Sequence, residues 1–187
     1  MGRVGLKNVV GILTLWVLCF VMTAGTAAWA ASAASIDADA NVTLERFYKE
    51  VSSGKELVKS AKGVLIFPSV LKAGIGLGGE YGEGALKIKG KTVDYYSTAA
   101  ASIGFQFGAQ KKSIVVIFMQ REALNKFRAS SGWKAGVDAS IAVVTVGAGG
   151  AMDTSKLKEP ILGFILDQKG LMYNLTLEGA KFTKISK

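Results

Sequence analysis

The side chains that most often catalyse reactions or bind metals are scarce in this sequence. It has no histidine, and its one cysteine, Cys19, lies in an apolar segment near the N-terminus. The chain therefore offers no imidazole base, and beyond residue 33 it offers no thiol nucleophile and no thiolate ligand for zinc. Only carboxylates, lysines and hydroxyls remain. We expect no enzyme activity, no catalytic residue, no metal site and no cofactor.

Two pairings among the remaining groups could still do chemistry. Glu80 and Glu83 are close in sequence, but residues three apart on a strand point to opposite faces, so a paired-carboxylate site would need a bulge. Solvated turn charges are the simpler interpretation of both. A Ser–Lys dyad stays open, because serines and lysines are plentiful and no spacing selects one pair.

Gly74, Gly76 and Gly79 form a literal G-x-G-x-x-G pattern. That pattern binds dinucleotides when it lies between a strand and a helix. Residues 80–84 contain two more glycines and show no helical periodicity, so we expect no nucleotide site here. A small, strongly curved sheet explains glycines within strands more simply, because a tight bend or a close backbone approach leaves no room for a side chain.

Helices are predicted at the start of the domain, followed by strands. After a short lead-in over residues 34–40, Asn41 is expected to cap a helix whose apolar residues recur at i, i+3, i+4 and i+7. These residues are Leu44, Phe47, Tyr48 and Val51. A second helical segment is predicted over residues 55–62. A third is predicted over residues 121–129, with Leu124 and Phe127 pointing inward.

The remaining pattern favours short strands. They are expected over residues 63–67, 74–89, 92–97, 102–108, 113–120, 139–146, 161–167 and 171–177, with hairpin turns at Gly90–Lys91 and at 168–170. The apolar run 113–120 is expected to be buried on both faces. The predicted fold class is α+β and mostly β: a small, strongly curved antiparallel sheet, barrel-like or sandwich-like, with N-terminal helices and one short internal helix.

The first residues follow the pattern of a secretory signal peptide. Arg3 and Lys7 precede an uncharged run over residues 9–22, and a stretch of small residues follows. We expect a signal peptide over residues 1–30, cleaved after Ala30 or Ala33, and one domain over residues 34–187. The apolar run is shorter than the ~20 residues that span a bilayer comfortably, although an uncleaved anchor is the alternative. The expected location is the periplasm or the periphery of the cell envelope.

The domain is basic. Residues 34–187 carry 21 basic and 14 acidic side chains, a formal charge of +7. Lys55, Lys59 and Lys62 recur at i, i+4 and i+7 and would form one stripe. Anionic lipid headgroups, which attract each nearby basic residue by about 1 kcal/mol, are the expected partner. Nucleic acid is not expected, because the chain is exported and carries no nucleic-acid motif.

The first helix allows two interpretations. Its apolar residues could insert into the membrane interface while its basic residues contact headgroups. Alternatively the apolar face packs against the domain's own sheet, which the periodicity alone favours. The candidate lipid-binding residues are Leu44, Arg46, Phe47, Lys49, Val51, Lys55, Lys59 and Lys62.

Four ordered blocks resemble one known family. The first is Ala61–Pro68 with the glycine-rich residues 72–84, the second is Tyr95–Ser97 with 101–110, the third is 112–119, and the fourth is 170–179. Together they are similar to the SYLF domain over about residues 40–185. The exported form resembles the bacterial lipid-binding SYLF proteins in particular.

The resemblance implies a non-enzymatic, membrane-associated domain. Eukaryotic relatives bind phosphoinositides through an N-terminal amphipathic helix, which matches residues 42–62 here, and some bind actin. Actin is not an expected partner, because export from a bacterial cytoplasm meets none unless a host supplies it. Bacterial envelopes also usually offer other anionic lipids. The alternative function is a small structural outer-membrane β-barrel or an envelope scaffold, although residues 113–120 lack the in-out alternation of a membrane strand.

Overall fold

Two long antiparallel strands, β1 (Gly63–Ile88) and β2 (Lys91–Phe118), form the centre of the computed structural model. They pair along their whole length, from Gly63 opposite Phe118 to Ile88 opposite Lys91. The structure describes residues 31–144, 157–169 and 177–187, without the side chains of 75–77, 102–109 and 167–169. Lys89 and Gly90 join the two strands with positive φ angles of 51° and 78°, as a tight two-residue hairpin requires.

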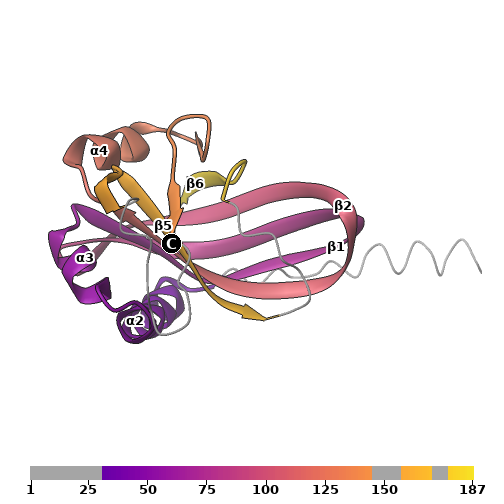
Figure 1. Cartoon of the computed structure of the whole chain (residues 1–187), viewed down its shortest axis with the longest axis horizontal. Coiled ribbons are helices and arrows are strands. Elements are labelled where there is room, and N and C mark those ends of the chain that lie inside the picture. Colours follow the sequence, from indigo (N-terminus) through magenta and orange to yellow (C-terminus); the bar gives the residue numbers. More distant parts are fainter. Residues whose placement is uncertain (1–30, 145–156, 170–176) are drawn as a thin grey trace, which may run out of the picture. The chain divides into compact units, whose positions relative to one another are not determined.

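The short strands attach to different parts of β2. Its early residues pair with β6 (Lys181–Ile185), and its late residues pair with β5 (Ile161–Lys169). β3 (Trp133–Lys134) continues the sheet beyond β6, and β4 (Ala142–Val144) runs parallel to β5. The order is β3-β6-β2-β5-β4, with β1 beside β2. The two long strands therefore run through the whole of one strongly curled sheet (Figure 1).

The curl brings the two halves of β1 against each other. A Cβ atom added at Gly84 would lie 2.3 Å from the carbonyl oxygen of Ile66 and 2.6 Å from Cδ1 of Phe67. A Cβ at Gly82 would lie 2.6 Å from the carbonyl oxygen of Ser69. Real Cβ atoms do not approach backbone this closely, so these two positions require glycine. The close approach expected of strand glycines is confirmed at both.

Gly84→Ala is therefore expected to lower the free energy of unfolding by about 1–3 kcal/mol, because overpacking forces the backbone of early β1 to move. Urea unfolding followed by circular dichroism measures the effect. Gly79→Ala is the matched control on the same strand, since a Cβ there meets nothing within 4 Å. Equal stability of the two variants would contradict the close packing of β1 on itself.

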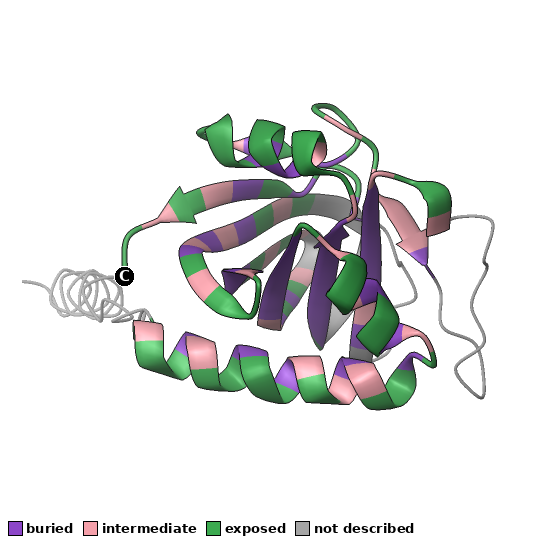
Figure 2. Cartoon of the chain, turned by 90° about the vertical axis from the view of Figure 1, so that its left-hand side faces the viewer, coloured by how far each residue is buried: buried purple, intermediate pink, exposed green. Residues whose placement is uncertain are grey.

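Three helices flank the sheet: α2 (Ala33–Glu50), α3 (Gly54–Ser60) and α4 (Arg121–Ala129). Ser32 caps α2, because its Oγ accepts a hydrogen bond of 3.1 Å from the backbone N–H of Ser35. α2 and α4 lie on opposite sides of the curled sheet (Figures 1 and 2). No helix within the described residues is long and apolar enough to cross a membrane.

The two faces of the sheet bury separate hydrophobic clusters. Leu65 and Phe67 of β1 pack with Phe127 of α4, whereas Val64 and Ile66 point the other way and pack with Phe47 of α2. This alternation follows the two-residue period of a strand. Late β2 contributes to both clusters, so the burial of its apolar run on both faces is confirmed over residues 113–118.

The predicted fold class is confirmed, and α4 occupies the predicted residues 121–129 with Leu124 and Phe127 buried. Four details are corrected. The lead-in over residues 34–40 is helical, five separate strands are two continuous ones, the hairpin turn lies one residue earlier than predicted, and β4 is parallel to β5. The predicted signal peptide, residues 145–146 and the strand predicted over 171–177, except Leu177, lie outside the described residues.

Candidate functional site

The apolar face of α2 packs against the sheet. Phe47 is 0% exposed, and its ring meets Phe164 of β5 edge-on with centroids 4.9 Å apart. Val51 is also fully buried, and Leu44 is half-buried against the same cluster. The structure therefore corrects the insertion role expected of Phe47 and Val51. Periodicity could not decide this point, because a helix presents the same 3.6-residue pattern to a sheet and to a membrane.

Phe47 also positions the next helix. A Cβ added at Gly54, where α3 begins, would lie 3.1 Å from Cε1 of Phe47, so the backbone of α3 rests directly on this ring. Leu57 is the buried side chain of α3 beyond that contact. Residues two positions before and after Leu57 point away from the core on a helix, and these are Lys55 and Lys59. Burial of one aromatic ring thus fixes which side of α3 faces solvent.

Four lysines form the exposed basic surface of this region, which we call the lysine stripe. They are Lys49, Lys55, Lys59 and Lys62. None of them has an ion-pair partner among the described residues, and only Lys62 makes a side-chain hydrogen bond, a 3.5 Å contact with the carbonyl oxygen of Ser60. Arg46 differs, because it is half-buried and interacts within the chain. The four side chains of the lysine stripe are therefore exposed at the surface of the domain.

Acidic residues lie on the same two helices. Glu45, Glu50 and Glu56 are all exposed. The surface is therefore mixed in sign with a basic excess rather than uniformly positive. Such a surface attracts anions weakly and is sensitive to salt, because exposed charges are screened over about 8 Å at physiological ionic strength.

The prediction from sequence missed one apolar residue on the outer side of α2. Val42 is 62% exposed and precedes Lys49 by seven residues, so both share one helical face that points away from the sheet. The signal was present in the sequence, because the seven-residue spacing places Val42 and Lys49 on one face of a helix that begins at either Ala33 or Asn41. Val42 is the large apolar side chain that α2 presents to solvent.

The two carboxylates considered for catalysis serve as ion-pair partners instead. Glu80 binds Nζ of Lys112 at 2.9 Å, and Glu83 binds Nζ of Lys187 at 2.7 Å while accepting a 3.0 Å hydrogen bond from the hydroxyl of Tyr81. They therefore form no paired-carboxylate site. Both are also shielded from solvent, which corrects their interpretation as solvated turn charges.

A third carboxylate that forms ion pairs, Asp94, lies near the start of β2. Asp94 accepts a 3.0 Å hydrogen bond from Nε of Arg128 and also pairs with Lys184, which ties α4 and β6 to the sheet. Its neighbour Tyr96 is buried, and burial together with the charge of Asp94 raises the pKa of this phenol to about 12. Within the described ranges, no group of three or more acidic, histidine or cysteine side chains is arranged to hold a metal ion.

Comparison with known proteins places the second half of the chain in a family. No curated protein matches the chain. Residues 99–187 match the model of the Ysc84 family, described as a Las17-binding protein actin regulator. The matched range holds most of β2, α4 and strands β3 to β6, whereas the lysine stripe lies before it. The family indicated by the sequence resemblance is therefore confirmed: residues 99–187 form a Ysc84-type, or SYLF, segment.

Proposed function

We propose that this is an exported, non-enzymatic SYLF-type protein of the cell envelope that binds anionic membrane surfaces through the lysine stripe. The observation that carries the proposal is the exposure of four lysines without an ion-pair partner in the described part of the chain. A surface that keeps its cations unpaired remains able to bind external anions. Export and residence in the periplasm rest on the N-terminal sequence pattern.

The expected binding is reversible. Four basic residues near an anionic surface contribute about 4 kcal/mol together, which corresponds to a dissociation constant of about 1 mM. Val42 can add apolar contact with the interface, because it is exposed on the same side of α2 as Lys49. Phe47 and Val51 contribute indirectly, by holding α2 and α3 in place. Actin is not part of the proposal, because an exported bacterial protein does not share a compartment with it.

Neutralising the stripe should abolish most of the binding. The triple variant Lys55→Gln, Lys59→Gln and Lys62→Gln is expected to bind vesicles of phosphatidylglycerol and phosphatidylcholine about 100-fold more weakly. Flotation of the vesicles with bound protein measures the effect. Raising the salt concentration from 0.05 M to about 0.5 M should weaken the unmodified protein in the same way, since screening acts on the same charges.

A second triple variant separates the stripe from total charge. Lys111→Gln, Lys134→Gln and Lys158→Gln remove three exposed lysines elsewhere on the domain. This variant should retain nearly all binding. Equal loss in both variants would show that only net charge matters, and equal flotation with pure phosphatidylcholine vesicles would refute electrostatic binding altogether.

A further inference from the structure

The face of the sheet that packs against α4 also carries buried charges. Lys72 follows Val70 by two residues on β1, and Lys112 precedes Ile114 by two residues on β2. Val70 and Ile114 belong to the hydrophobic cluster on this face, so the alternation of a strand turns both lysines the same way. Lys72 is 7% exposed and Lys112 is 3% exposed. Because Val70 is the residue opposite Lys112, the two lysines are diagonal neighbours on paired strands.

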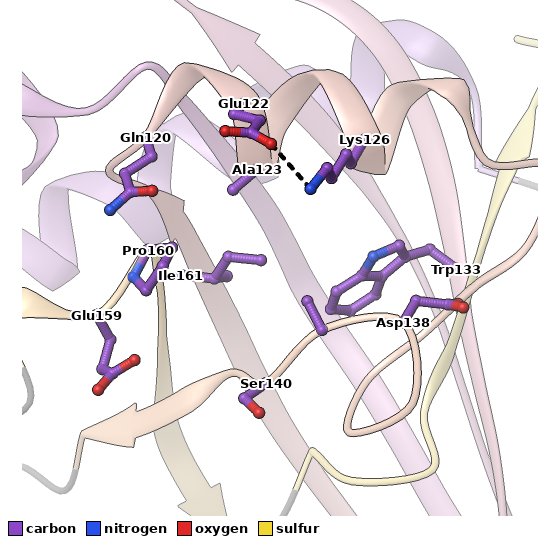
Figure 3. A pocket seen from close by; sticks show the side chains of 11 residues that line it. Gln120, Glu122, Ala123, Lys126, Trp133, Asp138, Ser140, Glu159, Pro160 and Ile161 are labelled. Carbon is purple, nitrogen blue, oxygen red and sulfur yellow. Dashed lines mark ion pairs between the residues drawn. The ribbon is translucent and has the colours of Figure 1, made fainter.

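A single carboxylate pairs with one of these lysines. Oε2 of Glu80 lies 2.9 Å from Nζ of Lys112, whereas Lys72 has no ion pair and no hydrogen bond among the described residues. The exposed pair of Glu122 and Lys126 in Figure 3 has the same separation, but its side chains are 76% and 75% exposed, so water solvates both charges. Side chains within the sheet lack that solvation, and a buried charge is costly unless a partner neutralises it. The group of Glu80, Lys72 and Lys112 therefore retains one uncompensated positive charge.

A buried hydroxyl lies beside the same group. Thr98 is 0% exposed, and its Oγ1 has no hydrogen-bond partner in the described part of the chain. Thr98 is opposite Gly82, which follows Glu80 by two residues, so Thr98 and Glu80 are diagonal neighbours on the same face. A Cβ atom added at Gly82 would lie 2.8 Å from Cγ2 of Val70, the residue opposite Lys112. Because buried hydroxyls are nearly always paired, this one indicates an acceptor that the described residues do not supply.

We propose that Lys72 and Thr98, beside the pair of Glu80 and Lys112, bind the carboxylate group of an organic acid. A carboxylate oxygen accepts the hydroxyl proton of Thr98 in a hydrogen bond, and the negative charge neutralises Lys72. One negative charge balances the one uncompensated positive charge, so a carboxylate fits better than a phosphate dianion. The site does not rest on the lysine stripe, whose side chains are exposed at the surface.

Amide NMR of the full chain tests the proposal. Titration with hexanoate should shift the backbone amide resonance of Thr98 saturably, whereas hexanol, which has the same chain length but no charge, should not shift it. Inorganic phosphate should bind more weakly than hexanoate. Acetate separates two sources of the carboxylate. If acetate binds as tightly as hexanoate, the ligand is a small soluble acid, whereas binding at least tenfold weaker than that of hexanoate identifies a fatty acid.

Variants identify the groups responsible. Lys72→Met and Thr98→Val should each raise the dissociation constant for hexanoate about tenfold, because each removes a hydrogen bond to a charged group. Lys111→Met removes an exposed lysine next to Lys112 in sequence and should change nothing. Tyr96→Phe removes another buried hydroxyl without a partner in the described ranges. This variant should also bind hexanoate normally, because the Tyr96 ring packs against Phe127 of α4 with centroids 4.7 Å apart.

Urea unfolding separates lost binding from lost structure. Without ligand, Lys72→Met and Thr98→Val should unfold at a urea concentration at least as high as that of the unmodified protein, since each removes a buried polar group that lacks a partner. The triple variant of Lys55, Lys59 and Lys62 should bind hexanoate normally, so a failure of membrane binding leaves this test unaffected. The proposal would be overturned by the absence of any saturable shift with hexanoate and acetate, by an equal response to hexanol, or by unchanged dissociation constants in both Lys72→Met and Thr98→Val.

Discussion

Phe47→Ala is expected to lower the free energy of unfolding by about 3–5 kcal/mol, the usual effect of removing a buried phenyl ring. The ring is 0% exposed and lies between Phe164 of β5 and the backbone of Gly54. Its loss would leave a cavity where α2, α3 and the sheet meet. Urea unfolding followed by circular dichroism measures the change.

The same substitution separates two roles for α2. Val42→Ala is the matched control, because Val42 is on the same helix but 62% exposed. The free energy of unfolding of this variant should change by less than about 0.5 kcal/mol. If Phe47 held α2 in place, Phe47→Ala would weaken vesicle binding only as far as it unfolds the domain. If Phe47→Ala left the free energy of unfolding unchanged but abolished vesicle binding, the ring would contact the membrane directly, which would contradict its burial in the domain.

The helices show how far local pattern predicts structure. The extent of α4 followed from Leu124 and Phe127, because its ends coincide with changes in the apolar period. The start of α2 was missed because Asn41 is a good cap in isolation, although Ser32 caps the helix instead. Ala40 and Ile36 lie on the buried face of Phe47, seven and eleven residues before it, and this longer apolar pattern was the signal available in the sequence.

The long strands could not be predicted from local signals. Pro68 and the glycines of β1 are typical of strand ends, yet β1 continues through them. Pro68 lies where the register between β1 and β2 shifts, a position at which a missing N–H is tolerated, and its carbonyl accepts a 2.8 Å hydrogen bond from Ser113. The need for glycine at residue 84 depends on Ile66, which no spacing in the sequence brings near it.

The candidate sites also differ in whether local sequence patterns or contacts between distant residues determine them. Exposure of Lys55 and Lys59 was predictable from helical spacing, whereas Lys49 lies on α2 and Lys62 lies beyond the end of α3, which stops at Ser60 instead of the predicted residue 62. The partners of Glu80 and Glu83 lie far along the chain at Lys112 and Lys187, so their ion pairs depend on the fold.

Glu80→Ala is expected to lower the free energy of unfolding by about 3–5 kcal/mol, because it leaves a buried ammonium without its partner. Lys112 is 3% exposed and Glu80 is 8% exposed, and the two atoms of the pair lie 2.9 Å apart. The exposed pair of Glu122 and Lys126 has the same separation, so Glu122→Ala is a control of equal geometry and should show no resolvable change. Urea unfolding of both variants provides the comparison.

A double variant distinguishes an unpaired charge from lost packing. Glu80→Leu with Lys112→Met replaces both charged side chains by apolar ones of similar size, and such replacements of buried pairs are often neutral or stabilising. It should therefore recover most of the stability lost in Glu80→Ala. If the double variant were as unstable as the single one, the loss would come from packing within the curled sheet rather than from the charge of Lys112. Recovery of stability would instead show that the loss in Glu80→Ala comes from the unpaired charge of Lys112.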